Sequence, residues 1–320
     1  MIIKKAIIIG GAGCIGYQVC KILSKKNIKV IAFDLEEKLQ TIKDKDFKNI
    51  TKIGGSIMDK VSLLDAMKEC DVVIHLAAYL GVERTEKNKS KCIEININGT
   101  QNVIDCINKL KSVKKILFAS SSEVYGEPIE NPVSEKSLTQ GKTIYAITKL
   151  AGEEIVKANY QSNKVKYTIL RYFNTYGPYQ VSQFVISKFI DAVRNNQPPI
   201  INGDGEQIRS YIYSEDTARA TAECVLNNKT NNKVLNVGNG DAKITIYKLA
   251  KLIIKIFNKN KIKPKFNKKF KRSDRTKKRE IFFRVCDSDY IKKLIGFKPK
   301  ISLASGIKKT IKKNQNFKNW

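Results

Sequence analysis

Tyr145 and Lys149 stand four residues apart in a segment with helical periodicity, and this spacing suits proton transfer. Residues four apart on a helix share one face, so the lysine ammonium can lie near the tyrosine phenol. A neighbouring positive charge favours the ionised phenol, which makes a tyrosine usable as a base near neutral pH. The spacing alone is weak evidence, because such pairs are common on exposed helices, and its weight depends on the motifs that precede it.

A glycine-rich turn near the N-terminus predicts a dinucleotide site. Gly10, Gly13 and Gly16 follow a short apolar run and precede a predicted helix. In this pattern the first glycine permits a tight turn, the second lets the backbone approach a pyrophosphate, and the third allows close packing of helix against strand. The helix N-terminus offers its positive dipole to the phosphates. We expect Cys14 and Ile15 to be among the cofactor-binding residues of this turn.

Asp34 indicates which dinucleotide is bound. It ends the second predicted strand, about 20 residues beyond the glycines. An acidic side chain there accepts hydrogen bonds from the adenosine ribose hydroxyls, and no neighbouring arginine is present to bind a 2′-phosphate. The predicted cofactor is therefore NAD rather than NADP.

The rest of the composition excludes several other kinds of site. His75 is the single histidine, so a histidine-based metal site or a Ser-His-Asp triad is hard to assemble. The seven cysteines are scattered and form no Cys-x-x-Cys pair, which indicates reduced thiols and no structural zinc. No apolar run reaches the roughly 18 residues of a membrane span. We expect a cytoplasmic protein with neither a metal nor a membrane partner.

The formal net charge of +30 is concentrated near the C-terminus. Residues 251–320 contain 24 Lys and Arg against 4 Asp and Glu, a net charge of +20. A nucleic-acid-binding role is one interpretation, but the stretch lacks zinc, helix-turn-helix and aromatic-basic signatures. A solvated surface that steers an anionic substrate explains the charge as well. We expect no nucleic-acid partner, and keep a non-catalytic dinucleotide- or nucleic-acid-binding protein as the alternative outside the enzymes.

Strands that alternate with helices must position these residues. Such alternation predicts an α/β fold, a doubly wound parallel (Rossmann) sheet covered on both faces. The strands are expected at 6–9, 30–33, 72–76, 116–119, 168–172 and 234–237, and the helices at 15–25, 62–68, 92–110, 144–160 and 184–195.

The rhythm of the chain changes after Pro178 and indicates a second part. We expect residues 1–175 to form the NAD-binding domain, with a returning segment near 211–238. Residues 176–320 are expected to form mainly a smaller, discontinuous substrate-binding lobe. Open α/β sheets bind ligands at the carboxyl ends of their strands, where this lobe would lie.

Further motifs spread over nearly the whole chain. With the glycine turn, Tyr145 and Lys149, they resemble the extended short-chain dehydrogenase/reductase family, in the branch of nucleotide-sugar epimerases, 4,6-dehydratases and decarboxylases. These motifs are His75-Leu76-Ala77-Ala78, Asn98-Gly99-Thr100, Ser120 to Gly126, Arg171 to Asn174, Tyr176-Gly177-Pro178, Gly203 to Tyr211, Asp216, and Asp287 before Gly296.

The resemblance implies a role for each of these residues. Tyr145 would be the catalytic base, Lys149 would hold the nicotinamide ribose and lower the pKa of the tyrosine, and Ser121 would relay the proton. Asn174 and Arg209 resemble residues that contact the phosphates of a substrate nucleotide. The remaining residues implied to bind NAD are Ser56, Ile57, Leu76, Ala77, Ala78 and Asn98.

The expected first reaction is oxidation of a sugar carbon, usually C4, with hydride passing to NAD. Re-reduction on the opposite face would make a 4-epimerase, which needs little beyond the tyrosine and the serine. Ser122, which is predicted to bind substrate, and Glu123 stand where dehydratases commonly carry two carboxylates. The same Ser-Glu pair also resembles the one in sugar-nucleotide decarboxylases. A local cap or salt bridge by Glu123 is equally consistent. Arg284 stands where 4-epimerases size the sugar pocket, and suits a pyrophosphate or a substrate carboxylate.

From these residues we rank an NAD-dependent nucleotide-sugar epimerase first, and a 4,6-dehydratase or a UDP-glucuronate-type decarboxylase that uses Glu123 second. Ser56 replaces the aspartate that usually touches adenine, so that hydrogen bond is either missing or supplied by Asp59. The resemblance also implies a homodimer in which the helices at 92–110 and 144–160 of two copies pair.

Overall fold

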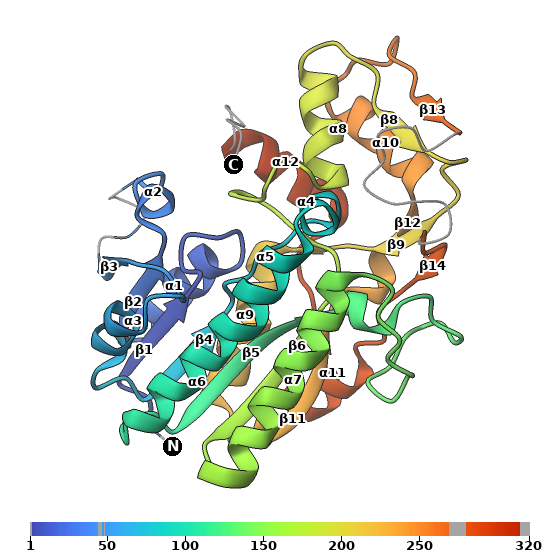
Figure 1. Cartoon of the computed structure of the whole chain (residues 1–320). Coiled ribbons are helices and arrows are strands. Elements are labelled where there is room, and N and C mark those ends of the chain that lie inside the picture. The colour runs from blue at the N-terminus through green and yellow to red at the C-terminus, as the bar shows by residue number, and fades with distance from the viewer. Residues whose placement is uncertain (1, 44–46, 48, 269–279, 314–320) are drawn as a thin grey trace.

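The computed structural model describes residues 2–43, 47, 49–268 and 280–313. Its centre is a seven-stranded sheet in the order β11-β6-β5-β4-β1-β2-β3, and every neighbouring pair is parallel (Figure 1). The strand order reverses beside β1, so the predicted doubly wound sheet is confirmed. The strands are β1 (Lys5–Ile9), β2 (Lys29–Asp34), β3 (Ile50–Gly54), β4 (Val72–His75), β5 (Lys115–Ser121), β6 (Lys166–Tyr172) and β11 (Lys233–Val237).

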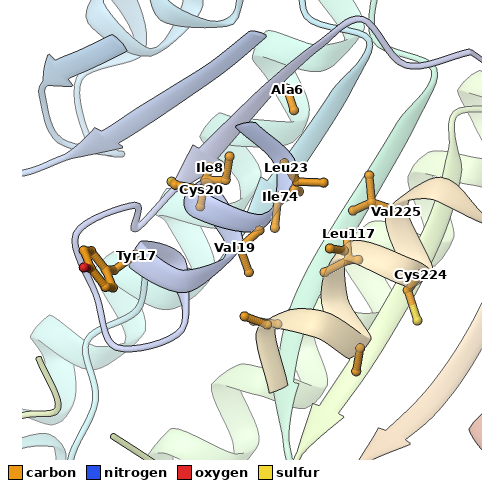
Figure 2. Close-up of a cluster of buried hydrophobic side chains, with 14 of the residues drawn as sticks. Ala6, Ile8, Tyr17, Val19, Cys20, Leu23, Ile74, Leu117, Cys224 and Val225 are labelled. Atoms are coloured by element: carbon orange, nitrogen blue, oxygen red, sulfur yellow. The ribbon is translucent and has the colours of Figure 1, made fainter. Parts of the chain in front are cut away.

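Helices cover both faces of this sheet, which is why most of the residues in its inner strands are apolar. On one face lie α1 (Gly16–Ser24), α9 (Ser214–Leu226) and α11 (Asp289–Ile295). On the other lie α3 (Lys60–Met67), α6 (Gly99–Lys109) and α7 (Ile144–Asn163). Figure 2 shows the first of these cores, where strand residues meet helix residues: Ala6, Ile8, Ile74 and Leu117 against Val19, Leu23 and Val225.

The helix predicted at 92–110 is interrupted. The chain forms α4 (Val82–Lys87), α5 (Lys89–Ile93), the π-helical turn η2 (Glu94–Asn98) and then α6. A π turn holds one residue more than an α turn and therefore rotates the side chains around it. As a result Asn96 is buried beneath α7, whereas Asn98 is exposed.

A second core lies beyond the carboxyl ends of the large sheet, at the upper right of Figure 1. It is formed by α8 (Val185–Arg194), α10 (Ile246–Ile256) and α12 (Leu303–Lys313) with three small sheets, β12-β9-β14, β13-β8 and β10-β7. The division of the chain near residue 175 stays our proposal. The short strands are β7 (Thr175–Tyr176), β8 (Ile200–Asn202), β9 (Ile208–Ser210), β10 (Ile212–Tyr213), β12 (Lys243–Thr245), β13 (Lys265–Asn267) and β14 (Phe283–Arg284).

Candidate active site

The carboxyl end of β5 and the first turns of α7 bring the three predicted catalytic residues together. Thr143 caps α7, and its hydroxyl oxygen accepts a hydrogen bond from the Ala146 amide at 3.2 Å. In the next turn the Lys149 ammonium lies 5.8 Å from the centre of the Tyr145 ring. The Tyr145 hydroxyl is hydrogen-bonded to the side chain of Ser121, the last residue of β5. A proton leaving a substrate hydroxyl can therefore pass to the phenol, with the serine beside it.

The groups around Tyr145 act on its pKa in opposite directions. Burial raises the pKa of the phenol, the charge of Glu123 raises it further, and the Ser121 hydrogen bond opposes both. The Lys149 ammonium donates to the Ala119 carbonyl at 2.8 Å, and burial lowers its own pKa to about 8. That Lys149 lowers the pKa of the tyrosine stays a prediction.

The glycine turn forms a cradle bare of side chains between β1 and α1. Gly10 has a φ of +91° and donates to the Phe33 carbonyl at 2.8 Å, which fixes the tight turn. A Cβ at Gly16 would clash with the carbonyl oxygen of Gly10. The same carbonyl accepts from the Gly13 amide at 3.2 Å. Such an exposed backbone beside a helix N-terminus fits a dinucleotide pyrophosphate.

The neighbours of this cradle lie where a cofactor groove requires them. Leu76 and Ala77 follow β4, and both of their amides donate to the Ile9 carbonyl, at 2.8 and 2.9 Å. A Cβ at Gly10 would lie 2.7 Å from the Ala77 amide nitrogen, so the two loops touch. Cys14 and Ile15 lie in the turn before α1, and Ala78 follows Ala77. Their contacts with NAD stay a prediction.

Asp34 ends β2 beside the turn. Its carboxylate accepts hydrogen bonds from the amides of Ala12 and Leu35, both at 2.9 Å. We expect an Asp34→Ala variant to bind NAD about tenfold to a hundredfold more weakly, because a charged acceptor for the ribose hydroxyls is lost. A fluorescence titration of NAD measures the change. The control is Glu37→Ala, an exposed neighbour whose loss should leave the affinity unchanged; equal affinities in both variants would contradict the assignment.

Asp59 caps the helix next to the predicted adenine side of the groove. Its carboxylate accepts from the amides of Val61 and Ser62 at 3.0 and 3.2 Å and from the Ser62 hydroxyl at 2.5 Å. The Ser56 hydroxyl oxygen accepts from the Met58 amide at 3.2 Å. Ile57 is buried against Gly99. The contacts of Ser56 and Ile57 with NAD, and an adenine hydrogen bond to Asp59, stay predictions.

Asn96, rather than the predicted Asn98, connects the cofactor loop with α7. Its side-chain amide accepts from the Tyr79 amide at 2.7 Å and donates to the Tyr79 carbonyl at 3.0 Å. It also donates to the Thr148 hydroxyl at 3.0 Å, directly before Lys149. Asn98 is exposed because the π turn rotates it outward. Two asparagines stand before Gly99, and only the turn shows which one faces inward.

Arg284 and Glu123 form a buried ion pair at the entrance to the catalytic residues. Arg284 Nη2 donates to Glu123 Oε1 at 2.6 Å, and the side chains are 1% and 14% exposed. Within the described part of the chain, Arg284 Nε and Nη1 have no hydrogen-bond partner. Buried guanidinium nitrogens without partners are costly, so they indicate a place for an acceptor group.

The other predicted substrate residues surround this pair. Arg209 is the register partner of Arg284 on the neighbouring strand β9. Its guanidinium Nη2 donates to Glu280 at 3.1 Å and to the Ile281 carbonyl at 2.5 Å, and a contact with a substrate phosphate stays a prediction. The Asn174 amide donates to the Ser210 carbonyl at 3.0 Å. Ser122, next to Glu123, is buried.

The fold and this geometry define a class: a Rossmann fold whose glycine turn suits a dinucleotide and which brings Ser121, Tyr145 and Lys149 together. Residues 6–238 match a family model described as the NAD dependent epimerase/dehydratase family, and the chain belongs to that family. Its cofactor is NAD. No helix within the described ranges is long and apolar enough to cross a membrane.

Similar proteins include enzymes with different outcomes. A UDP-N-acetyl-alpha-D-glucosaminuronate decarboxylase of Bacillus cytotoxicus is 33% identical over 96% of this chain and 97% of that protein. A putative UDP-glucose 4-epimerase of Methanocaldococcus jannaschii is also 33% identical, over 97% of this chain and 99% of that protein. The structure of a UDP-glucuronic acid 4-epimerase from Bacillus cereus, in complex with UDP-glucuronic acid and NAD, has a TM-score of 0.86 at 26% identity, covering 97% and 99% of the two chains. The chain is therefore a nucleotide-sugar enzyme of the epimerase, dehydratase or decarboxylase kind.

Proposed function

We propose that the protein is an NAD-dependent decarboxylase of a UDP-linked hexuronate, a sugar whose C6 is a carboxylate. The observation that carries the proposal is the buried Arg284, whose Nη2 holds Glu123 while Nε and Nη1 have no hydrogen-bond partner among the described residues. A substrate carboxylate is an acceptor of the right charge for those two nitrogens. The decarboxylase and the hexuronate 4-epimerase among the similar proteins support a substrate of this kind.

The chain's own residues suit each step of such a reaction. In the ionised form that Lys149 is predicted to favour, Tyr145 takes the proton of the C4 hydroxyl, with Ser121 beside it. Bound NAD would supply the hydride acceptor for C4 and, after carbon dioxide has left, the hydride donor. The C4 ketone stands β to the carboxylate, so the electron pair of the breaking C5–C6 bond passes into that carbonyl. Arg284 orients the carboxylate for this cleavage. Glu123, whose Oε1 lies 2.6 Å from Arg284 Nη2, is the nearby acid-base group for reprotonation at C5.

A nucleotide-sugar 4-epimerase is the second candidate. It needs the assembled Ser121, Tyr145 and Lys149 and makes no use of Glu123, and relatives of that activity are as similar in sequence as the decarboxylase. A 4,6-dehydratase is less well supported, because the buried Ser122 supplies a hydroxyl where the carboxylate pair would need an acid. The assembled catalytic residues also disfavour a binding protein without chemistry.

One product analysis separates these activities. The purified protein is incubated with NAD and, separately, UDP-glucuronate, UDP-N-acetylglucosaminuronate and UDP-glucose, with ¹³C at the carboxyl carbon of the uronates, and the products are identified by NMR. We expect labelled carbon dioxide and a UDP-linked pentose from a uronate. A C4-inverted sugar that keeps its carboxylate would establish the epimerase instead, and a 4-keto-6-deoxy sugar from UDP-glucose would establish the dehydratase.

Two further proposals concern the setting of the enzyme. We propose a homodimer that pairs α5, η2 and α6 with α7, because Ile93 and Ile147 on these helices are 41% and 52% exposed. Apolar side chains exposed on neighbouring helices are typical of a surface that a second copy covers.

The proposed cytoplasmic location rests on the seven cysteines, all of which are free thiols in the structure.

A further inference from the structure

A row of polar side chains crosses the large sheet just below the catalytic residues. Ser120 on β5, Arg171 on β6 and Asn236 on β11 are register partners on three neighbouring parallel strands. All three are buried in a sheet whose other inward-facing residues are mostly apolar. Ser120 directly precedes Ser121, so the row lies one residue from the proton relay.

Glu153, on helix α7, packs against this row. It stands on α7 one helical turn after Lys149 and is 0% exposed. Its carboxylate accepts from Arg171 Nε at 2.9 Å, from Arg171 Nη2 at 2.7 Å and from the Ser120 hydroxyl at 2.5 Å. The bidentate pair and the serine thereby fix α7 to β5 and β6 at one point.

The other end of the row fixes the turn that carries Glu123. Arg171 Nη1 donates to the Tyr125 hydroxyl at 3.0 Å, and that hydroxyl donates to Asn236 Oδ1 at 2.7 Å. Tyr125 ends η3 (Ser122–Tyr125), the 3₁₀ turn that contains Glu123. One guanidinium therefore connects the helix of Tyr145 and Lys149 with the turn of Glu123.

Burying an ion pair in this position needs a reason other than stability. Removing two charges from water is expensive, and apolar residues of similar volume often replace such pairs without loss of stability. We propose that Glu153 and Arg171 are positioning residues, which hold the catalytic helix and the Glu123 turn in register. This inference rests on the proposed role of Tyr145 and Lys149.

The surroundings of Lys149 show how the charge of Glu153 acts on the catalytic lysine. The titratable groups around the ammonium are His75 on β4, Cys92 on α5, and Tyr145 and Glu153 on α7. Burial lowers the pKa of His75 to about 3 and raises the pKa of the Cys92 thiol and of the Tyr145 phenol, so all three are neutral at pH 7. Cys92 and then Glu153 raise the pKa of Lys149 against the effect of burial, and Glu153 is the member of this set that forms an ion pair as the negative partner.

Two variants of the one ion pair test the proposal. Glu153→Gln removes the negative charge and leaves the Arg171 charge behind, so the pKa of Lys149 falls and the loss of activity at high pH moves down by about 0.5 to 1 pH unit. Arg171→Met leaves Glu153 without its counter-charge, so the pH at which activity is lost on the alkaline side, the alkaline limb, stays the same or rises. The readouts are the pH dependence of turnover and the pH dependence of NAD affinity, which needs no sugar substrate.

The controls distinguish positioning from folding. Glu154→Gln changes the exposed neighbour on the same helix, which pairs with Lys157, and should leave both profiles unchanged. Thermal melts confirm that each variant is folded. The double variant Glu153→Gln/Arg171→Met, free of buried unpaired charge, should return the limb close to its wild-type position but keep a lowered kcat, because the contacts that hold α7 and the Glu123 turn in register are lost; a wild-type kcat in this folded variant would also overturn the inference. An unmoved limb in folded Glu153→Gln, or shifts of the same direction in both single variants, would overturn the inference. If wild-type protein turns over no sugar nucleotide, the proposed function fails, and the NAD profiles still decide the inference.

Discussion

A Tyr145→Phe variant is expected to lose turnover about a thousandfold or more while binding NAD as tightly as the wild type. Phenylalanine keeps the ring but removes the hydroxyl that is hydrogen-bonded to Ser121. General acid-base catalysis by a positioned side chain typically contributes about 10² to 10⁴ in rate. The measurements are kcat on the best uronate substrate and the dissociation constant of NAD.

Tyr160→Phe is the matched control for this experiment. Tyr160 stands on the same helix, and its ring packs edge to face against Tyr167 at 5.8 Å, away from the catalytic residues. Its hydroxyl should be dispensable for kcat. If Tyr145→Phe keeps wild-type turnover, another group is the base and the mechanism proposed above is wrong.

An Arg284→Met variant is expected to lose decarboxylation of the uronate about a hundredfold or more, a change in activation free energy of about 2.7 kcal/mol. Methionine retains part of the buried volume but offers no donor to the substrate carboxylate. It also leaves Glu123 without its partner at 2.6 Å. The value of kcat/KM for each uronate, measured alongside binding of UDP-glucose, shows whether the loss is specific to the carboxylate.

Arg284→Lys separates charge from geometry in the same experiment. Lysine keeps the positive charge but not the planar set of five donors, so partial activity is expected. A thermal melt shows whether loss of the buried pair unfolds the protein. Full uronate turnover in folded Arg284→Met would remove the arginine from substrate binding and return the 4-epimerase to first place.

The buried pair is the reason that our ranking of activities differs from the one that the sequence favours. Arg284 and Glu123 are 161 residues apart, so their pairing depends on where β14 joins the small sheet. Sequence reasoning finds both residues and cannot decide whether they meet. The same limit applies to Arg209 and Glu280, which pair across 71 residues.

Local patterns predicted the large sheet well because buried parallel strands carry continuous apolar runs, and because the glycine turn has few alternatives. β3 was not predicted. It lies at the exposed edge of the sheet, and the polar residues Thr51 and Lys52 interrupt its short apolar run. The small lobe was mostly missed because two- and three-residue strands have no readable period. Asn96 was missed because a π turn has no signature in the sequence and shifts the buried face by one residue.

The position of β11 at the edge of the large sheet affects how the site is made during synthesis. β11 covers β6, and Asn236 completes the row that begins at Ser120. A nascent chain that has reached only residue 175 has no β11, so β6 presents an open strand edge that is prone to pair with other chains. Arg284 emerges later still. Asn236 and Arg284 therefore join a site whose catalytic residues and Glu153–Arg171 pair have already been synthesised, and we expect the fold to close over its site only after the last third of the chain has left the ribosome.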